Sequence, residues 1–125
     1  MKVLFAYPDH KFVQLYQQHL KDHFFVDSAH DGLTALRKFK ANRPGIVVSS
    51  YHLPVFSGVA LLKFIRNSPN ISATPFVFLS EKVDNSDALS YGANDWIEIS
   101  DSSPDLLIKK IYYHLNLNKH ALQIR

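Results

Sequence analysis

The chain has 125 residues, of which 46% are hydrophobic and 20% charged, and this length and composition predict one globular domain with a buried core. It contains no cysteine, which excludes disulfides, cysteine-based zinc sites and thiol nucleophiles. Its apolar runs are far shorter than a membrane span, and the N-terminus lacks the apolar stretch of a signal peptide, so we expect a soluble, cytoplasmic protein.

The net charge of +3 is unevenly distributed along the chain. Residues 1–66 carry nine Lys and Arg against four Asp and Glu, a net of +5, whereas residues 67–125 carry five against seven, a net of −2. This difference is typical of two solvated faces, and it also fits a basic patch that faces a partner. Four basic residues gather in the predicted second helix: Arg37, Lys38, Lys40 and Arg43. They lack the stacking aromatics or reading helix of a nucleic-acid site, so nucleic-acid binding is not expected.

Short apolar runs alternate with helical patterns along the chain, which predicts βαβ units and a parallel sheet. The predicted strands are residues 3–6, 24–28, 46–48, 76–79 and 96–99. Helix starts are indicated at Asp9, Asp31-Gly32, Ser57 and Ser103-Pro104, and only a short helix fits within 84–91. The first helix is expected to turn four apolar residues inward: Phe12, Leu15, Tyr16 and Leu20.

The composition of the strands predicts their order in the sheet. The first, third and fourth strands are apolar without alternation, as expected of central strands covered on both faces. The second and fifth contain Asp27 and Glu98, as edge strands tend to. With right-handed crossovers, this predicts a three-layer, doubly wound α/β fold of the flavodoxin-like type, with strand order 2-1-3-4-5.

In such a sheet, functional residues collect at the carboxyl ends of the strands. In this chain those ends are Tyr7-Pro8-Asp9, Ser49-Ser50, Ser80 and Ile99-Ser100. The sequence therefore predicts a pocket there with several hydroxyls and one carboxylate.

Four segments resemble the receiver domain of two-component response regulators, in the order and spacing of that family. They are residues 2–6, which resemble its first strand, 30–36, which resemble the start of its second helix, 51–58, which resemble the loop after its third strand, and 92–96, which resemble its Gly-Ala-Asp-Asp-Tyr stretch. The resemblance covers about residues 2–115. It implies the receiver fold and a role in signalling, with residues 116–125 as a helix extension or linker.

The resemblance also marks where this chain departs from the family. The family's phosphoacceptor aspartate, four residues before the proline of the third-strand loop, corresponds to Ser50. Its metal-binding acidic pair corresponds to Tyr7 and Pro8, with Asp9 one position later, and only the hydroxyl that ends strand four is kept, as Ser80.

The family's lysine and cis-proline at the end of strand five correspond to Ile99 and Ser100. Mg²⁺ prefers oxygen ligands that include carboxylates, and phosphoryl transfer needs a metal or cation to neutralise developing charge. We therefore expect a degenerate phosphorylation pocket without metal. A phosphate on Ser50 would be a stable ester, not a labile acyl phosphate, and would not recreate the usual switch.

Three aromatic residues are candidates for an interface: Trp96, Tyr91 and Tyr112. Trp96 occupies the family's aromatic switch position, where it can anchor a partner or simply pack, and its N–H needs a hydrogen-bond acceptor. The segment 80–92 is about one helical turn shorter than in the family, which alters the face that receivers commonly use for dimers or output partners.

Two groups of histidines are the other candidates for metal ligands in the sequence. His19 and His23 share a helix face but lack a third ligand, and His10 and His52 with Asp9 border the degenerate pocket. Surface histidines are the simpler interpretation of both, so no metal is expected.

These observations predict a phosphorylation-independent receiver-like module that is not an enzyme, has no cofactor, and acts by binding protein partners or itself. The alternatives are a working phosphorelay receiver with an unusual site, or a nucleic-acid- or ligand-binding protein on the same fold. A flavodoxin-like cofactor enzyme is disfavoured, because the loop 7–10 has no glycine and too few hydroxyls to cradle a phosphate. Pathway, partner, oligomeric state and any output domain are not encoded in recognisable features.

Overall fold

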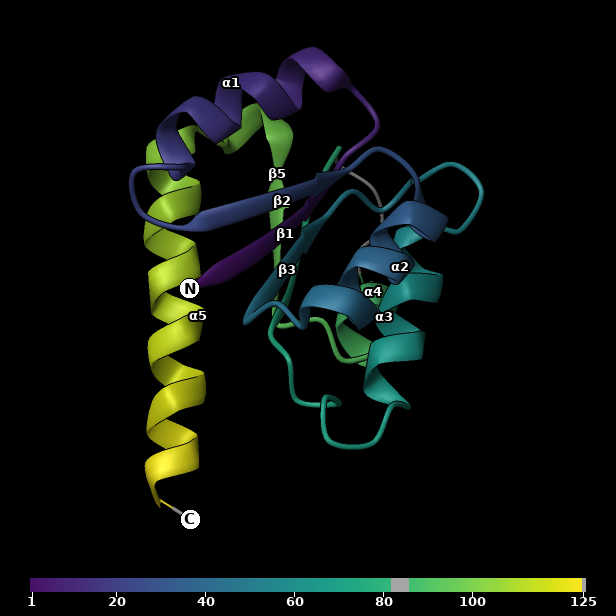
Figure 1. Ribbon diagram of the computed structural model, residues 1–125, viewed down its shortest axis with the longest axis vertical. Coiled ribbons are helices and arrows are strands. Elements are labelled where there is room, and N and C mark those ends of the chain that lie inside the picture. Colours follow the sequence, from purple (N-terminus) through teal and green to yellow (C-terminus); the bar gives the residue numbers. More distant parts are fainter. Residues whose placement is uncertain (82–85, 125) are drawn as a thin grey trace.

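The computed structural model describes the backbone of residues 1–81 and 86–124, and the side chains of 1–81 and 88–116. Strands and helices alternate as predicted (Figure 1). The strands are β1 (Lys2–Ala6), β2 (Phe25–Ala29), β3 (Ile46–Ser49), β4 (Phe76–Ser80) and β5 (Asp95–Glu98). The helices are α1 (His10–Leu20), α2 (Gly32–Asn42), α3 (Gly58–Arg66), α4 (Ser86–Ser90) and α5 (Pro104–Ile124), with a 3₁₀ turn at Ile99–Asp101. Of the short helix predicted within 84–91, positions 84 and 85 lie outside the described residues.

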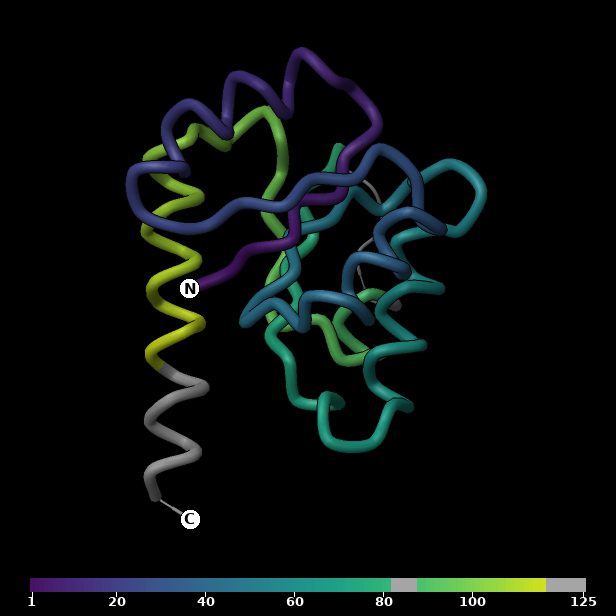
Figure 2. The backbone as a smooth tube through the Cα atoms, viewed as in Figure 1, coloured from purple at the N-terminus to yellow at the C-terminus, as the bar shows by residue number. Residues whose placement is uncertain are grey.

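The five strands form one parallel sheet in the order β2-β1-β3-β4-β5, which confirms the predicted topology. Helices α1 and α5 cover one face, and α2, α3 and α4 cover the other (Figure 1). Because all strands run the same way, the segments that follow β1, β2, β3 and β5 leave the sheet at one edge, and the backbone trace lets the reader follow them (Figure 2). The residues of the predicted pocket follow the strands at this carboxyl edge.

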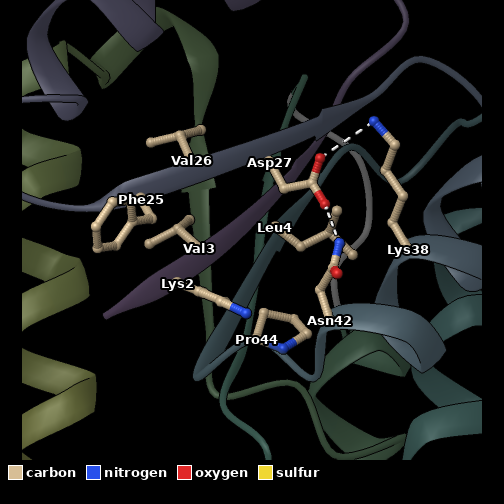
Figure 3. A pocket seen from close by; sticks show the side chains of 9 residues that line it. All are labelled: Lys2, Val3, Leu4, Phe25, Val26, Asp27, Lys38, Asn42 and Pro44. Carbon is tan, nitrogen blue, oxygen red and sulfur yellow. Dashed lines mark hydrogen bonds and ion pairs between the residues drawn. The ribbon is translucent and has the colours of Figure 1, made fainter.

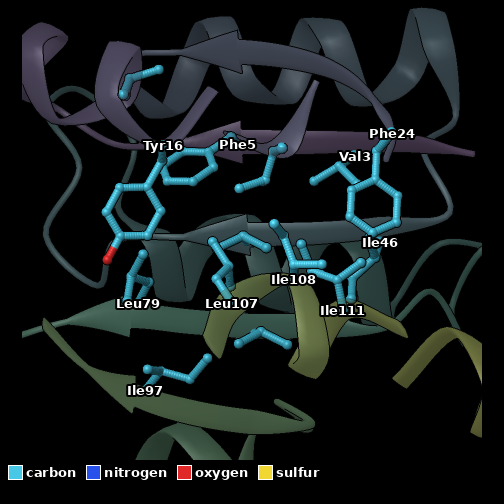
Figure 4. Packing of buried hydrophobic residues seen from close by; sticks show 14 residues of the cluster. Val3, Phe5, Tyr16, Phe24, Ile46, Leu79, Ile97, Leu107, Ile108 and Ile111 are labelled. Atoms are coloured by element: carbon cyan, nitrogen blue, oxygen red, sulfur yellow. The ribbon is translucent and has the colours of Figure 1, made fainter. Parts of the chain in front are cut away.

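Two hydrophobic clusters hold the layers together, one on each face of the sheet. Along β1, Val3 and Phe5 belong to the cluster under α1 and α5, whereas Leu4 and Ala6 belong to the cluster under α2 and α3. The first cluster is shown in Figure 4, where Leu107 and its neighbours on α5 lie against the strands. Uninterrupted apolar strands are therefore needed at the centre, because both of their faces are buried.

The predicted inner face of α1 was wrong at one position. Leu15 is 52% exposed, and Val13 is buried in its place, beside Tyr16 and Leu20. A helix starting at His10 turns positions 13, 16 and 20 to the sheet and leaves Leu15 on its exposed side. The Tyr16 hydroxyl donates to Ser102 Oγ at 2.9 Å, which ties α1 to the start of α5.

Side-chain caps fix the starts of the helices at the predicted residues. The Asp9, Asp31 and Ser57 side chains accept hydrogen bonds from backbone N–H groups in the first turns of α1, α2 and α3. Ser103 does the same for Leu106 of α5, directly before Pro104. Helix α5 continues to Ile124, so residues 116–124 extend the helix, while a domain boundary at residue 115 stays a prediction. Among the helices of the described chain, none is long and apolar enough to span a membrane.

Asp95 links the edge strand β5 to α5. Its carboxylate accepts hydrogen bonds from His114 Nε2 at 2.9 Å and Lys110 Nζ at 3.2 Å, and His114 is 7% exposed. Burial alone would raise the pKa of Asp95, but these hydrogen bonds outweigh it and hold the pKa below its usual 3.8.

We expect this link to be lost in acid. A carboxyl with a lowered folded-state pKa stabilises the fold above its unfolded pKa and loses that contribution as the pH falls through the folded value. The stability lost on Asp95→Asn, measured by urea denaturation, should therefore be constant above about pH 5 and shrink below 3.8. Asp22→Asn, which removes one exposed negative charge elsewhere, is the control. A difference between wild type and Asp95→Asn that does not change between pH 5 and pH 3 would contradict the prediction.

Candidate functional site

The carboxyl ends of β1, β2 and β3 are tied together where the pocket was predicted. Ser50 N–H donates to Ala6 O at 2.8 Å, and Tyr7 N–H donates to Ala29 O at 2.9 Å. The predicted pocket residues therefore do lie along one edge of the sheet, with Ser80 beside them at the end of β4. Ser100 stands apart, on the exposed side of the 3₁₀ turn that follows β5.

Ser50 and Ser80, two of the serines at this edge, are buried and used within the protein. Ser50 is 6% exposed, and its hydroxyl contacts His52 O at 3.4 Å. Ser80 is 3% exposed and accepts a hydrogen bond from Tyr51 N–H at 3.3 Å. Both hydroxyls therefore hold the loop after β3, and neither is presented to solvent as a free acceptor.

Tyr7 is partly buried and packs against the hydrophobic cluster under α1 and α5. Its ring stacks on Phe12 of α1 with centroids 4.2 Å apart and 20° between the planes. Burial raises the pKa of Tyr7, and the negative charges of Glu81 and Asp9 raise it further. The phenol is therefore neutral and acts as an apolar group at this edge.

Ile99 packs against the same hydrophobic cluster as Tyr7. These are the positions of an acid and a lysine in the resembling family, and here both are apolar. Each packs against the same cluster, so position 99 supplies no ammonium group at the end of β5.

Asp9 is the carboxylate that the sequence predicts near the pocket, and one of its oxygens caps α1. Its Oδ1 accepts from Lys11 N–H at 2.9 Å and from Phe12 N–H at 3.4 Å as the cap of α1. Pro8, which directly precedes Asp9, offers no side-chain ligand. A metal at this edge would therefore have to share the Asp9 carboxylate with the helix cap.

The histidines near this edge are engaged in other contacts. His10 and His30 stack with ring centroids 3.6 Å apart, and His30 Nδ1 lies 3.0 Å from Tyr7 O. On the other side of the molecule, His23 Nδ1 lies 3.1 Å from the Tyr112 hydroxyl. Within the described residues, no three His, Asp or Glu side chains come together as a metal site.

Hydrogen bonds from two glycines hold the loop 51–57 at the carboxyl edge of the sheet. Gly32 N–H donates to Pro54 O at 2.9 Å, and Gly58 N–H donates to Tyr51 O at 3.1 Å. A Cβ on Gly32 would lie 1.4 Å from Phe56 O, and one on Gly58 would lie 2.1 Å from Ser50 O. The loop can approach this closely only because both positions lack a side chain.

Val55, at the tip of this loop, has a left-handed backbone. Its φ is 71°, a conformation that strains a β-branched residue. Its side chain is 80% exposed, so burial does not offset this strain. We expect Val55→Gly to stabilise the protein by about 1 kcal/mol, because glycine adopts this conformation freely. The midpoint of urea denaturation measures the change, with Val55→Ala as the control that keeps a Cβ. A Val55→Gly protein no more stable than Val55→Ala would refute the explanation.

The three candidate interface residues occupy separate places. Trp96 packs between Tyr51 and Phe78, at centroid distances of 5.4 and 5.2 Å, and its Nε1 is buried without a hydrogen-bond partner among the described residues. Tyr91 lies under Lys63 Nζ at 4.1 Å, on the α3 side.

Tyr112 packs on Phe24, near the turn between α1 and β2, with ring centroids 4.9 Å apart. Each of the three aromatics is held by different neighbours, so their contacts do not join them into one patch. Sequence reasoning missed the role of Tyr51, which bridges the loop and Trp96. Its aromatic side chain directly after Ser50 was the available signal.

Comparison with known proteins identifies the same family along nearly the whole chain. The family model described as the response regulator receiver domain matches residues 3–111. The chain is 36% identical over 80 residues to the transcriptional regulatory protein CseB of Streptomyces avermitilis, covering 62% of this chain and 33% of that protein. It is 32% identical over 93 residues to the uncharacterized transcriptional regulatory protein YcbL of Bacillus subtilis, covering 71% and 40%. The chain thus spans well under half the length of these relatives.

Solved structures give the same fold. The chemotaxis response regulator CheY4 of Vibrio cholerae superposes with a TM-score of 0.81 at 25% identity, over 90% of this chain and 97% of that one. The receiver domain of Francisella response regulator 1452 superposes with a TM-score of 0.82 at 26% identity, over 94% and 98%.

Proposed function

The chain belongs to the response regulator receiver family, and from that premise we propose that it is a degenerate receiver that signals without phosphorylation. It acts by binding protein partners, or itself, through a surface that needs no phosphoryl group to form. The observation that carries the proposal is the replacement of each charged part of the pocket: Ser50 stands at the acceptor position, and Tyr7 and Ile99 are packed into one apolar cluster.

Electrostatics supports this proposal. An incoming phosphoryl group and its Mg²⁺ need carboxylates and a cation to balance their charges. Asp9 caps α1, Pro8 and Ile99 carry no charge, and Glu81 directly after β4 is a second acid whose charge acts on Tyr7. The pocket edge therefore offers little to offset the cost of desolvating a phosphate and a divalent cation.

Ser50 is also a poor candidate for modification in the folded protein. Its side chain is 6% exposed and its N–H is bonded to β1, so a kinase would have to open the edge of the sheet to reach it. A serine phosphate would in addition be a stable ester. We propose a cytoplasmic module without catalytic activity of its own, in keeping with the sequence, whose partners are signalling proteins. Any output domain would lie outside this chain.

The test is incubation with a small-molecule phosphodonor and Mg²⁺, followed by intact-mass measurement. We expect no hydroxylamine-labile adduct on this protein, while a receiver domain with aspartate at the acceptor position is labelled in parallel. Ser50→Asp should also remain unlabelled, because the metal ligands and the lysine are still missing. A hydroxylamine-labile adduct on an aspartate of the unchanged protein would establish the alternative, a working receiver with an unusual site.

A further inference from the structure

The outer edge of β2 presents backbone groups that the sheet does not use. β2 is the first strand of the sheet and pairs with β1 alone. Phe25 N–H donates to Met1 O, and Ala29 O accepts from Tyr7 N–H, so residues 25, 27 and 29 bond to β1. The N–H and C=O groups of Val26 and Ser28 therefore point away from the sheet.

Lys38 closes one half of this edge. Its Nζ donates to Ser28 O at 2.6 Å and pairs with Asp27 Oδ1 at 3.1 Å. Asn42 Nδ2 binds the other oxygen of Asp27 at 2.7 Å (Figure 3). A lysine in this position hinders the pairing of a further strand with the edge. The part of the edge that remains open is therefore the stretch around Val26.

Two hollows flank this open stretch, one on each face of the sheet. The hollow on the α2 side has a volume of about 360 Å³ and lies between the β1–β2 pair and the end of α2, with Lys2, Phe25 and Pro44 on its wall (Figure 3). The hollow on the α1 side has a volume of about 580 Å³ and is lined by Val26 together with Gln14, Gln17, Gln18 and Lys21. Phe25 is 76% exposed, which is unusual for a phenylalanine in a strand.

The charges around the edge are mainly positive. Lys2 and Lys21 line the two hollows, and Arg43 precedes Pro44. Within the described part of the chain, none of these three has an ion pair, whereas Asp27 is already neutralised by Lys38. Asp22 is the remaining acid beside the strand. The open edge thus combines free strand groups, an exposed aromatic ring and a net positive charge.

We propose that the β2 edge binds an extended acidic peptide segment of a partner protein as a sixth strand beside Val26. Backbone hydrogen bonds to Val26 would hold the segment, and its alternate side chains would enter the hollows beside Phe25 and the α1 glutamines. Acidic side chains at its ends would meet Lys2 and Lys21. A second copy of this chain fits less well, because it would bring the same cations together. The proposal rests on the proposed function, protein binding without phosphorylation, and assigns it a surface.

The probe for this proposal is a fluorescein-labelled peptide of alternating Glu and Val, tested by fluorescence anisotropy at low salt. We expect the unchanged protein to bind it and the double variant Lys2→Glu, Lys21→Glu to lose at least about tenfold in affinity, which corresponds to 1.4 kcal/mol. The double variant Lys11→Glu, Lys109→Glu makes the same charge change at exposed lysines away from the edge and should bind nearly as well. A probe with N-methylated valines, which cannot complete a strand, should bind at least tenfold more weakly.

Three results would overturn the proposal. The first is an equal loss of binding in the two double variants. The second is undiminished binding of the N-methylated probe. The third is self-association of the protein that becomes stronger in the Lys2→Glu, Lys21→Glu variant. Changes of amide chemical shift on binding should centre on Val26, and a centre elsewhere would also refute the proposed surface. Failure of this test leaves the proposed function standing on another surface, whereas labelling of an aspartate by a phosphodonor would remove the proposed function itself.

Discussion

Gly32→Ala should destabilise the protein by about 3 kcal/mol, because the new methyl group would overlap the backbone of the loop above it. The Cβ would lie 1.4 Å from Phe56 O and 2.3 Å from Phe56 C. A backbone carbonyl cannot move aside as a flexible side chain can. The loop 51–57 would have to lift, and the hydrogen bond from Gly32 N–H to Pro54 O would lengthen or break.

The single tryptophan of the chain reports directly on this movement. Trp96 packs on Tyr51 of the same loop, so lifting the loop should change its fluorescence in the folded state as well as the free energy of unfolding. Gly45→Ala is the matched control. Its Cβ would lie 2.3 Å from Met1 Sδ, the mobile end of a side chain that is 62% exposed, so we expect a cost of well under half that of Gly32→Ala. Equal costs for the two variants would show that the loop is not held as described.

Periodicity and composition were sufficient to predict the fold. Uninterrupted apolar runs indicated the central strands, and Asp27 and Glu98 indicated the edges, because a strand with polar residues tolerates only partial burial. The caps at Asp9 and Ser57 were also readable, since these residues compensate free N–H groups at a helix start. The error at Leu15 arose because the apolar residues of α1 allow two overlapping faces, and only the sheet selects between them.

The chemistry of the pocket edge was readable only in part. The sequence placed Ser50, Tyr7 and Ile99 at the positions of charged residues in the family. It could not show that Tyr7 and Ile99 pack against one cluster, since that depends on rotamers set by Phe12 and its neighbours.

The sequence did not indicate the structural role of Arg66, whose side chain donates several hydrogen bonds. Its guanidinium donates to Gly92 O, Ser72 O and Thr74 O and to Asn94 Oδ1. Burial lowers its pKa, and within the described residues it has no carboxylate partner. A lone arginine at the end of a helix is ordinarily solvated, so only the structure shows that it joins the end of α3 to the turn before β5.

Tyr7→Asp, which restores an acid at a position where the family has one, should destabilise this protein by roughly 3 kcal/mol. The change removes the stacking of Tyr7 on Phe12 and places a carboxylate against the hydrophobic cluster. It also adds a negative charge near Glu81 and Asp9, whose charges, after burial, already raise the pKa of the Tyr7 phenol. The residues around position 7 pack on a neutral ring, so an acid placed there meets both desolvation and like-charge repulsion.

Two further variants at this position separate the causes. Tyr7→Phe keeps the ring and should cost less than about 1 kcal/mol, because the hydroxyl is not part of the stacking. Tyr7→Asn loses the ring without adding charge, so the difference between Asp and Asn measures the electrostatic part and should shrink as the pH falls and the new carboxyl is protonated. Free energies of unfolding from urea titrations at pH 7 and pH 4, with a chelator present, supply the comparison. If Tyr7→Asp proved as stable as Tyr7→Phe, the edge would still accommodate an acid, and the case for a pocket closed by apolar packing would fail.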